Sequence, residues 1–505
     1  MLSCLELLPP ELVHLILDAL SRILYSAKNV QEDFSRDCAV SLATVSHRLR
    51  ATVLPWMFAT IHNRHESLPP RALWSHFRTL HIRDVSASRN AAIVVSDALL
   101  MALAEMSHLT TVTIRLNSVI PDLCFSALSQ LPLLSSLEIY QIRLDGEVNF
   151  ARMTLPALEA LSLRIGGFFG VSRPANVDLA QEAQNIMHLL CTVAQKLRFF
   201  TISGDILPPA FGEIHWPGLI SLAITEHLPP THIPLSALVG QMPSLEKLEL
   251  LYTPDLARRR YSPFRVIRPG ETVPSQVLQR LSVLSLSNVH IYDPILQALP
   301  QNLKKLNLLA AWDVLDYQRL APPPFGSPPM GWMGEYRVSY LQWTSLLSQA
   351  SFPNLTALSM TIGPPSPAAV LIEAIASAAP NVLDLEFRHT IYDNSDDRLL
   401  TIDFIDPGFF TALRKFHQLD RFCIFIDYLR IHMNPGPPGH AAYRLFVEVP
   451  TLQTVVYKFS GYVSPPQSQM TCVWGREMLA RPAPPRVIRD LVLEGPAYSH
   501  IEDSD

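Results

Sequence analysis

The stretch Leu245-Glu-Lys-Leu248-Glu-Leu250 spells a short pattern of Leu, two residues, Leu, one residue and an apolar residue. A pattern that recurs many times along a chain is typical of stacked units that share one continuous core and do not fold alone. The sequence therefore predicts a repeat solenoid, and it favours a binding surface over a compact enzyme. Further copies of the pattern occupy residues 134–139, 158–163, 281–286, 303–308 and 355–360.

The spacing of the copies matches a leucine-rich repeat, a unit of one strand and one returning helix. The closest signatures start 22 to 27 residues apart, while the 52 residues between Leu303 and Leu355 predict an insertion at about 310–350. Apolar residues at helical spacing predict helices over 178–195, 338–349 and 367–379. Strand signatures begin at Phe77, Leu109, Leu134, Leu158, Leu197, Leu219, Leu245, Leu281, Leu303, Leu355, Val382, Leu419, Leu452 and Ile488.

The repeat units are predicted to be irregular. The family pattern places Asn or Cys three residues after the strand, where this chain has Ile142, Gly166, Thr253, Val289 and Ala311. We expect an α/β solenoid, an irregular leucine-rich-repeat horseshoe with a parallel sheet. The alternative is an ordinary α/β protein, because Leu-rich alternation also occurs in other parallel sheets.

Composition limits the classes of partner. The chain has 505 residues, of which 48% are hydrophobic and 17% are charged, and this balance is too apolar for a disordered protein. A formal net charge of -5 provides no general attraction to nucleic acid or to an anionic membrane surface. We therefore expect a protein partner, with no nucleic acid and no membrane.

Cysteine usage and the first residues indicate the compartment. The 6 cysteines include no CxxC pair, which favours free thiols in a reducing compartment. Glu6 and Glu11 interrupt the N-terminal apolar residues, which have no basic flank, so the pattern is unlike a signal peptide. The apolar stretch 91–106 contains Asp97 and Glu105 and is too short to span a bilayer. We expect a soluble intracellular protein, cytoplasmic or nuclear.

Residues 8–61 differ from the repeats. Helical spacing places Leu12, Leu15, Ile16 and Leu20 on one face of a short amphipathic helix. Because the apolar residues of such a short module exceed what it can bury by itself, we expect it to pack against something else.

Three segments of this module stand in a fixed order. A Leu-Pro-x-Glu-Leu opening starts at residue 8, a Val-Ser-x-x-x-Arg segment at residue 45, and a Pro-x-x-Phe-x-x-Ile ending at residue 55. The ordered set resembles an F-box, and the whole chain is similar to the fungal type of F-box protein with irregular leucine-rich repeats. The resemblance implies a small all-α F-box-like module over 1–62, a leucine-rich-repeat solenoid over 63–505, and a short acidic tail over 502–505.

The resemblance also implies a function. F-box proteins bind the Skp adaptor, which docks on a cullin scaffold carrying a RING subunit, and their repeats hold a target for ubiquitin transfer. The chain would then be a non-enzymatic substrate-recognition adaptor of a cullin-RING ubiquitin ligase. The alternative is a scaffolding repeat protein unrelated to ubiquitin, whose N-terminal module only caps the solenoid. The implied adaptor contacts are Leu8, Pro9, Leu12, Ile16, Leu20, Val45, Leu49, Pro55, Trp56 and Phe58.

The sequence holds no catalytic constellation. It lacks a Walker loop, an HExxH helix and a G-x-S-x-G elbow. The 17 histidines are dispersed, so we expect no metal site. Asp393, Asp396 and Asp397 lack EF-hand spacing, which favours a solvated loop over a calcium site. We expect no enzyme activity and no cofactor.

Side-chain alternation predicts where a target binds. The fourth signature residues Leu248, Leu284 and Leu306 are expected to point into the core, so the third and fifth residues face the open, concave side of the sheet. A rigid sheet loses little side-chain entropy on binding, which favours this side as the target site. The target-binding residues expected there are Lys247, Glu249, Lys305, Asn307, Asp384 and Glu386.

The insertion after Leu308 is a competing target site. It contains Trp312, Trp332, Tyr336 and Trp343. Large aromatic side chains are frequent anchors at protein interfaces. The sequence leaves both sites open, with the concave side preferred.

Overall fold

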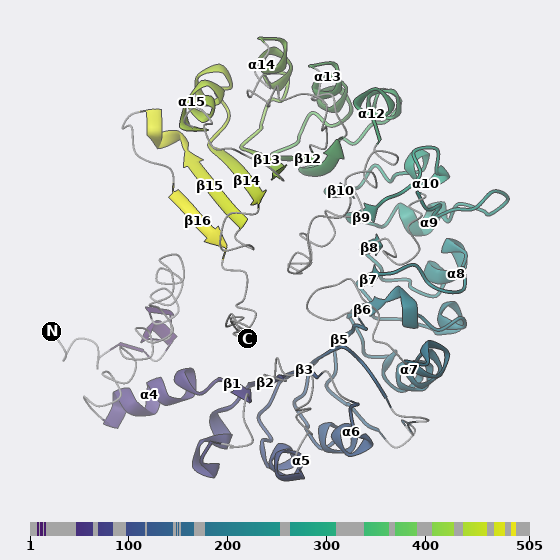
Figure 1. Cartoon of the computed structure of the whole chain (residues 1–505), viewed down its shortest axis with the longest axis vertical. Helices are drawn as coiled ribbons and strands as arrows, with labels where there is room; N and C mark the ends of the chain where they lie inside the picture. The colour runs from purple at the N-terminus through teal and green to yellow at the C-terminus, as the bar shows by residue number, and fades with distance from the viewer. Residues whose placement is uncertain are drawn as a thin grey trace, which may run out of the picture. The chain divides into compact units, whose positions relative to one another are not determined.

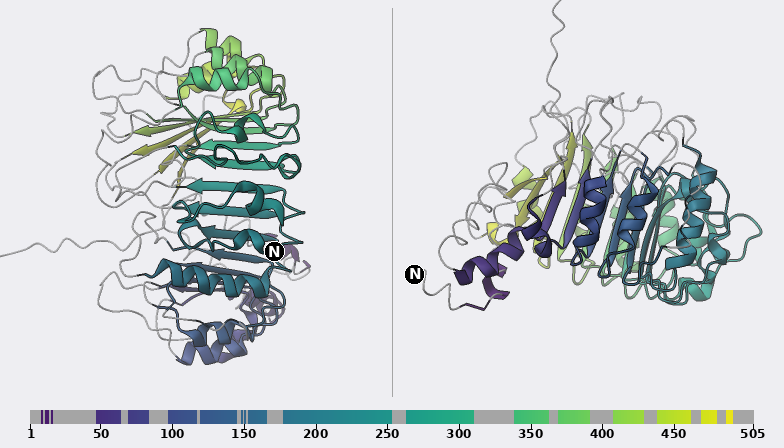
Figure 2. Two further views of the ribbon diagram at one scale, coloured as in Figure 1. Left: turned by 90° about the vertical axis from the view of Figure 1, so that its right-hand side faces the viewer. Right: turned by 90° about the horizontal axis from the view of Figure 1, so that it is seen from below.

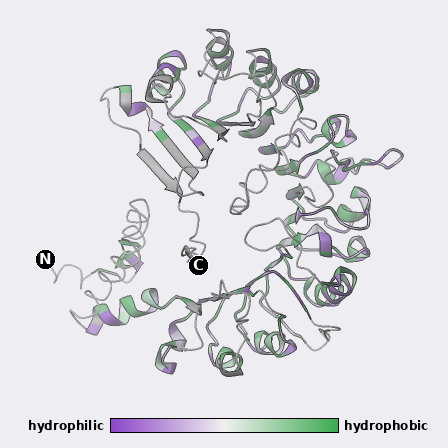
Figure 3. Cartoon of the chain, in the orientation of Figure 1, coloured by the Kyte–Doolittle hydropathy of each residue, from purple (hydrophilic) through white to green (hydrophobic). Residues whose placement is uncertain are grey.

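The computed structural model of the chain divides the described residues into two compact units, the first ending at Phe199 and the second beginning at Phe200. In each unit, strands alternate with helices (Figure 1). Figure 3 shows hydrophobic residues recurring in the strands and helices of both units. The structure describes residues 8–9, 11–13, 15–16, 47–63, 69–83, 97–116, 119–144, 148, 150, 153–165, 177–252, 263–309, 338–362, 369–390, 407–428, 438–461, 469–479 and 486–490.

The first unit is built on a parallel sheet whose strand order follows the chain. Its elements are α4 (His47–Met57), β1 (Thr60–Asn63), η1 (Arg71–His76), β2 (Thr79–Arg83), α5 (Asp97–Glu105), β3 (Thr111–Arg115), α6 (Asp122–Leu128), β4 (Ser136–Tyr140), β5 (Ala160–Leu163) and α7 (Leu179–Val193). Each strand from β1 to β5 pairs with the next in parallel. The register aligns Leu80, Val112, Leu137 and Leu161, and all four are buried.

The second unit continues the strand and helix pattern. Its first elements are β6 (Phe199–Ser203), η3 (Gly204–Ile206), η4 (Phe211–Glu213), β7 (Ser221–Glu226), α8 (Leu235–Gly240), β8 (Lys247–Tyr252), α9 (Ser275–Leu278), β9 (Val283–Ser287), α10 (Pro294–Gln297) and β10 (Lys305–Leu309). Its later elements are α12 (Tyr340–Leu347), β11 (Ala357–Ile362), α13 (Ala369–Ala378), β12 (Asp384–Thr390), α14 (Pro407–Leu413), β13 (Arg421–Tyr428), α15 (Pro438–Glu448), β14 (Thr454–Gly461), β15 (Gln469–Gly475), η8 (Arg476–Leu479) and β16 (Arg486–Asp490). Figure 2 shows neighbouring strands of this unit side by side, and β7 to β14 are parallel.

The core of the second unit lies between the sheet and its helices. Leu248, Leu284 and Leu306 occupy equivalent positions in β8, β9 and β10 and are fully buried. Their predicted place in the core is therefore confirmed. Fully burying one such side chain contributes about 1.5–3 kcal/mol to the free energy of folding. The same contribution recurs in each repeat unit that buries a leucine at this position.

Local sequence signals begin several helices. Asp178 caps α7 by accepting hydrogen bonds from the N–H groups of Ala180 and Gln181. Ser339 and Gln342 form a reciprocal capping box at the start of α12. Such caps satisfy N–H groups that have no partner within the helix. The helices predicted over 178–195, 338–349 and 367–379 are confirmed as α7, α12 and α13.

The last two strands depart from the predicted parallel sheet. The signature that starts at Ile488 overlaps β16 only at residues 488–490, and the rest of it lies outside the described residues. β16 pairs with β15 in the antiparallel direction, and β15 is antiparallel to β14. Only residues 462–468 separate β14 from β15. A parallel pair needs a crossover of about a dozen residues or more, so this connection is too short for one. The parallel repeat therefore ends at β14.

The predicted boundary at residue 62 falls inside a strand. Within 8–61, the described residues are helical at 11–13, 15–16 and in α4, and β1 begins at Thr60. β1 pairs with β2 in the register Thr60 to Thr79. The ending of the F-box-like segment thus supplies the first strand of the sheet in the first unit.

Candidate functional site

The inner face of the second unit, meaning the sheet face turned away from the buried leucines, carries two rows of residues. The parallel register aligns the third signature residues in a first row and the fifth in a second row. All six predicted target-binding residues belong to these rows. The first row is Lys247, Val283, Lys305, Ala357, Asp384 and Arg421. The second row is Glu249, Ser285, Asn307, Ser359, Glu386 and Cys423.

The two rows differ in exposure. In the first row Lys305 is exposed, and the side chains of Lys247 and Arg421 are 39% and 33% exposed. In the second row Glu249 is 7% exposed and Asn307 is 1% exposed. A partner can therefore reach the first row, whereas Glu249 and Asn307 are buried polar residues.

A chain of polar contacts links the second row across three strands. The Lys247 ammonium lies 2.9 Å from one carboxylate oxygen of Glu249. The Ser285 hydroxyl donates to the other oxygen at 3.2 Å, and the Asn307 amide donates to the Ser285 hydroxyl at 2.8 Å. Buried polar groups are costly unless they find such partners. These contacts explain how β8, β9 and β10 tolerate polar residues at buried positions.

Farther along the same face, an ionic cluster surrounds Glu386. Its carboxylate contacts the Arg388 guanidinium at 2.9 Å and the Lys458 ammonium at 3.4 Å. Burial disfavours the charged form of Glu386, but Arg388, Lys458 and Arg421 outweigh it and hold the pKa of this carboxyl below its ordinary value. In the first row, Arg421 forms two hydrogen bonds to Asp384, at 2.7 and 2.9 Å.

Among the charged residues of the first row, Lys305 is the one whose charge is not paired with another described residue. Lys247 is paired with Glu249, and Asp384 is paired with Arg421. Lys305 forms no ion pair with any residue that the structure describes. This exposed ammonium is therefore the strongest candidate in the row for a contact with an acidic group of a target.

The N-terminal helical segment exposes an apolar face. Leu12, Leu15 and Ile16 are 45%, 61% and 41% exposed, while Val13 is buried. The turn starts at Pro9, whose carbonyl accepts hydrogen bonds from the N–H groups of Leu12 and Val13. Leu12 and Ile16 are two of the predicted adaptor contacts, and Leu15 belongs to the same face at helical spacing.

The other predicted adaptor contacts lie in different surroundings. Leu8 is half-buried and Pro9 is exposed. In α4, Leu49 is buried and Pro55 is half-buried, and Phe58 just beyond α4 is also half-buried. Leu49 therefore belongs to the packed side of α4 rather than to a surface. Leu20, Val45 and the side chain of Trp56 lie outside the described residues.

Trp343, a predicted anchor of the competing target site, is a core residue. It is buried within α12, and its indole N–H donates to the carbonyl oxygen of Thr361 at 3.2 Å. The expectation that it anchors a target is thereby corrected, because its helical stripe faces the sheet. Trp312, Trp332 and Tyr336 lie outside the described residues.

A buried polar cluster at the ends of β6 and β7 was not foreseen from the sequence. The Ser203 hydroxyl donates to Glu226, and His227 Nδ1 lies 2.8 Å from Asp205 Oδ2. The chain passes so closely that a Cβ on Gly204 would clash with the carbonyl oxygen of His227. Ser, His and Asp side chains meet here, but all are buried and Ser203 is bonded to Glu226. The arrangement fastens two strand ends and is not a nucleophilic triad.

Two polar residues of α7 hold the chain that follows β4. Glu182 accepts a hydrogen bond from the Leu144 N–H at 2.6 Å, and Asn185 accepts one from the Val148 N–H at 3.1 Å. Burial raises the pKa of Glu182 to about 7, although the Leu144 hydrogen bond opposes the shift. A perturbed pKa is frequent at functional sites, but this buried carboxyl is engaged with backbone and serves the fold.

The described residues show no reactive or membrane-spanning arrangement. Within the described ranges, no three His, Cys, Asp or Glu side chains are grouped to hold a metal ion. Over the same part of the chain, no helix has the length and apolar character needed to cross a membrane.

Comparison with known proteins gives distant structural likenesses. No protein-family model and no curated protein matches the chain. A crystal structure of the TLR13–ssRNA13 complex is 14% identical, covers 78% of this chain and 61% of that chain, and has a TM-score of 0.27. The plant peptide hormone receptor RGFR1 in complex with RGF2 is 11% identical, covers 80% and 69%, and has a TM-score of 0.18. The chain thus spans less than two thirds of the first protein, and its fold assignment stands on its own strand order and register.

Proposed function

We propose that the chain is a non-enzymatic recognition adaptor that joins two proteins. Residues 8–61 bind the Skp adaptor of a cullin-RING ubiquitin ligase, and the first row of the inner face holds the protein that receives ubiquitin. The ordered F-box-like segments of 8–61 support the first contact. The reachable polar side chains of the first row support the second.

The exposed face of Leu12, Leu15 and Ile16 is the observation that carries the proposal. Three large apolar side chains at i, i+3 and i+4 spacing remain exposed on one helical segment. Contiguous exposed apolar residues mark protein interaction sites more often than scattered ones do. Their position directly after the Leu-Pro opening is where the F-box resemblance places adaptor contacts.

The test is co-purification of the full chain with the Skp adaptor and cullin. We expect the parent to recover both, and the triple variant Leu12→Ala, Leu15→Ala, Ile16→Ala to lose them. Truncating a large apolar anchor commonly costs ~2 kcal/mol, or about thirtyfold in affinity. The matched control replaces Met101 and Leu123 with Ala, since both are exposed apolar residues of the first unit, and it should bind like the parent.

A scaffolding repeat protein is the second candidate function. The burial of Leu49 and Val53 in α4 favours it, because a solenoid needs a packed terminal cap. Under this alternative, the parent recovers no adaptor, and removing residues 1–62 lowers the melting temperature of the repeats. Failure of the parent to recover the adaptor would reject the ligase proposal in favour of the scaffold.

A further inference from the structure

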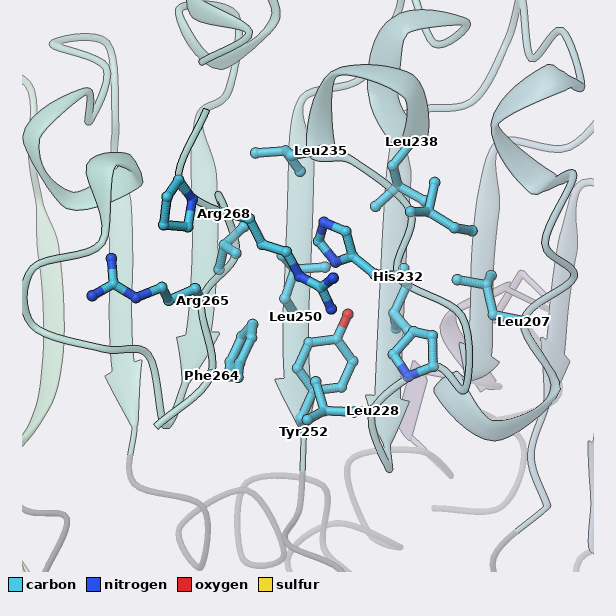
Figure 4. A pocket seen from close by; sticks show the side chains of 15 residues that line it. Leu207, Leu228, His232, Leu235, Leu238, Leu250, Tyr252, Phe264, Arg265 and Arg268 are labelled. Carbon is cyan, nitrogen blue, oxygen red and sulfur yellow. The ribbon is translucent and has the colours of Figure 1, made fainter. Parts of the chain in front are cut away.

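The second unit contains a cavity of about 420 Å³ at the carboxyl ends of β6, β7 and β8. Most of its lining side chains are apolar, and Figure 4 shows them gathered between the strands and α8. The size falls in the range of sites that enclose a small molecule. In parallel sheets, ligands bind beyond the carboxyl ends of the strands. The main wall residues are Leu207, Ile224, Leu235, Leu238 and Leu250.

The segment that closes one side of the cavity is firmly held. Phe264 pairs with Val289 in an isolated bridge, and its N–H donates to the Asn288 carbonyl at 3.1 Å. The buried Asp293 carboxylate accepts hydrogen bonds from the N–H groups of Val266 at 2.6 Å and Ile267 at 3.3 Å. These bonds fix the backbone of 264–267 against β9 and the start of α10. Backbone hydrogen bonds therefore fix the segment that forms this wall of the cavity.

One end of the cavity is polar. Arg268 is exposed, and Figure 4 shows its guanidinium at this end of the cavity, between the His232 ring and the Tyr252 hydroxyl. Burial raises the pKa of Tyr252, so its hydroxyl stays protonated at neutral pH and can donate a hydrogen bond. The Tyr252 ring also meets Phe264 edge to face, with ring centroids 4.8 Å apart. The Phe264 ring thus lies close to two hydrogen-bond donors, the Arg268 guanidinium and the Tyr252 hydroxyl.

The Glu271 carboxylate, which contacts the lining residue His232, is already engaged. It lies 2.6 Å from His232 Nε2 and accepts a hydrogen bond from the Arg268 backbone N–H at 2.9 Å. Burial opposes its ionisation, but these bonds and the charges of His232 and Arg268 hold the pKa of Glu271 below its ordinary value. Within the described residues, the Arg268 guanidinium itself forms no ion pair. Its planar donor fork is left for a ligand.

We infer that this cavity binds a small aromatic or aliphatic carboxylic acid. The apolar body lies between Leu238, Leu250 and Phe264, and the carboxylate accepts hydrogen bonds from the Arg268 guanidinium and the Tyr252 hydroxyl. Arginine suits a carboxylate because its donors match the two oxygens. The inference is independent of the proposed adaptor function, since it concerns a different face of the second unit.

Calorimetric titration of the full chain with naphthalene-2-carboxylate tests the inference, with 2-naphthylmethanol as the neutral analogue. We expect saturable binding of the carboxylate and affinity for the alcohol that is weaker by about tenfold or more, because the charge-assisted bonds are lost. Arg268→Gln should reduce carboxylate affinity by a similar factor and leave the alcohol unaffected.

The matched control is Arg265→Gln. Arg265 also borders the cavity and is exposed like Arg268, but its guanidinium points away from the cavity in Figure 4. This variant therefore removes a nearby positive charge without removing the proposed contact, and it should bind both probes like the parent. Leu238→Phe fills the cavity and should weaken both probes, with circular dichroism confirming that the variant is folded. Absence of saturable binding, equal affinity for acid and alcohol, or parental affinity in Arg268→Gln would each overturn the inference.

Discussion

The two rows of the inner face lie two residues apart on the same strands, yet the first row meets solvent while most of the second row is buried. In β9, the consecutive residues Val283, Leu284 and Ser285 are half-buried, core and fully buried. Alternation places Val283 and Ser285 on one face and Leu284 on the other. Alternation cannot predict which of the two rows is exposed, because exposure depends on which side chains meet across neighbouring strands.

Among the substitutions compared in this sheet, we expect replacement of the core residue Leu284 to cause the largest loss of stability. Leu284→Ala should lower the free energy of unfolding by about 2–5 kcal/mol, because it leaves a cavity in a closed core. Denaturant unfolding checks the value, and Val283→Ala on the same strand should cost much less. Hydrogen exchange should show the loss spreading to adjacent repeats, since neighbouring units share their core. A change confined to one repeat would argue against a continuous core.

Ser285 tests whether the second row is held by its polar contacts. Ser285→Ala removes the donor to Glu249 and the acceptor of the Asn307 amide. Leaving buried partners without a hydrogen bond should lower stability by about 1–3 kcal/mol. The double variant with Glu249→Gln measures the coupling, because residues of one network do not behave additively. Purely additive losses in unfolding experiments would mean that the network is not cooperative.

Glu386 gives the second row a pH dependence. Its folded pKa is lower than the ordinary value of 4.5, so the unfolded chain binds the proton more readily. The stabilisation is then fully present above about pH 4.5 and is lost as pH falls through the folded pKa. Melting temperatures of the parent and Glu386→Gln should therefore differ at pH 7 and converge in acid. A constant difference in melting temperature at every pH would show that the stability of the fold does not depend on the ionisation of Glu386.

Lys305 in the first row should affect stability least and recognition most. Lys305→Glu changes an exposed side chain, so the free energy of unfolding should stay within about 0.5 kcal/mol of the parent. Affinity for a target that contacts this row should fall and become less dependent on salt. Ser236→Glu, at an exposed position on α8, is the control that adds negative charge elsewhere. Equal losses in both variants would place the target off the first row.

Much of the fold could be predicted from residue patterns. Leu248, Leu284 and Leu306 lie where their period places them, and α7, α12 and α13 match their apolar stripes. β15 carries none of the predicted strand signatures. The antiparallel direction of β15 and β16 could not be predicted either, because side-chain alternation is the same in parallel and antiparallel strands. β1 was missed because its four residues are too few to show a period.

The sequence by itself determined the repeat, the positions of strands β2 to β14 and the identity of the leucines in the core, because a strand side chain's face follows from a period of two. Only the tertiary structure decided that Trp343 is a core residue, that Glu249 and Asn307 are covered while Lys305 is exposed, and that Arg268 and Tyr252 meet at a cavity. Those outcomes depend on contacts between residues distant in sequence. No period along the chain encodes such contacts, because burial and pairing are set by the neighbours that each strand and loop acquires on folding.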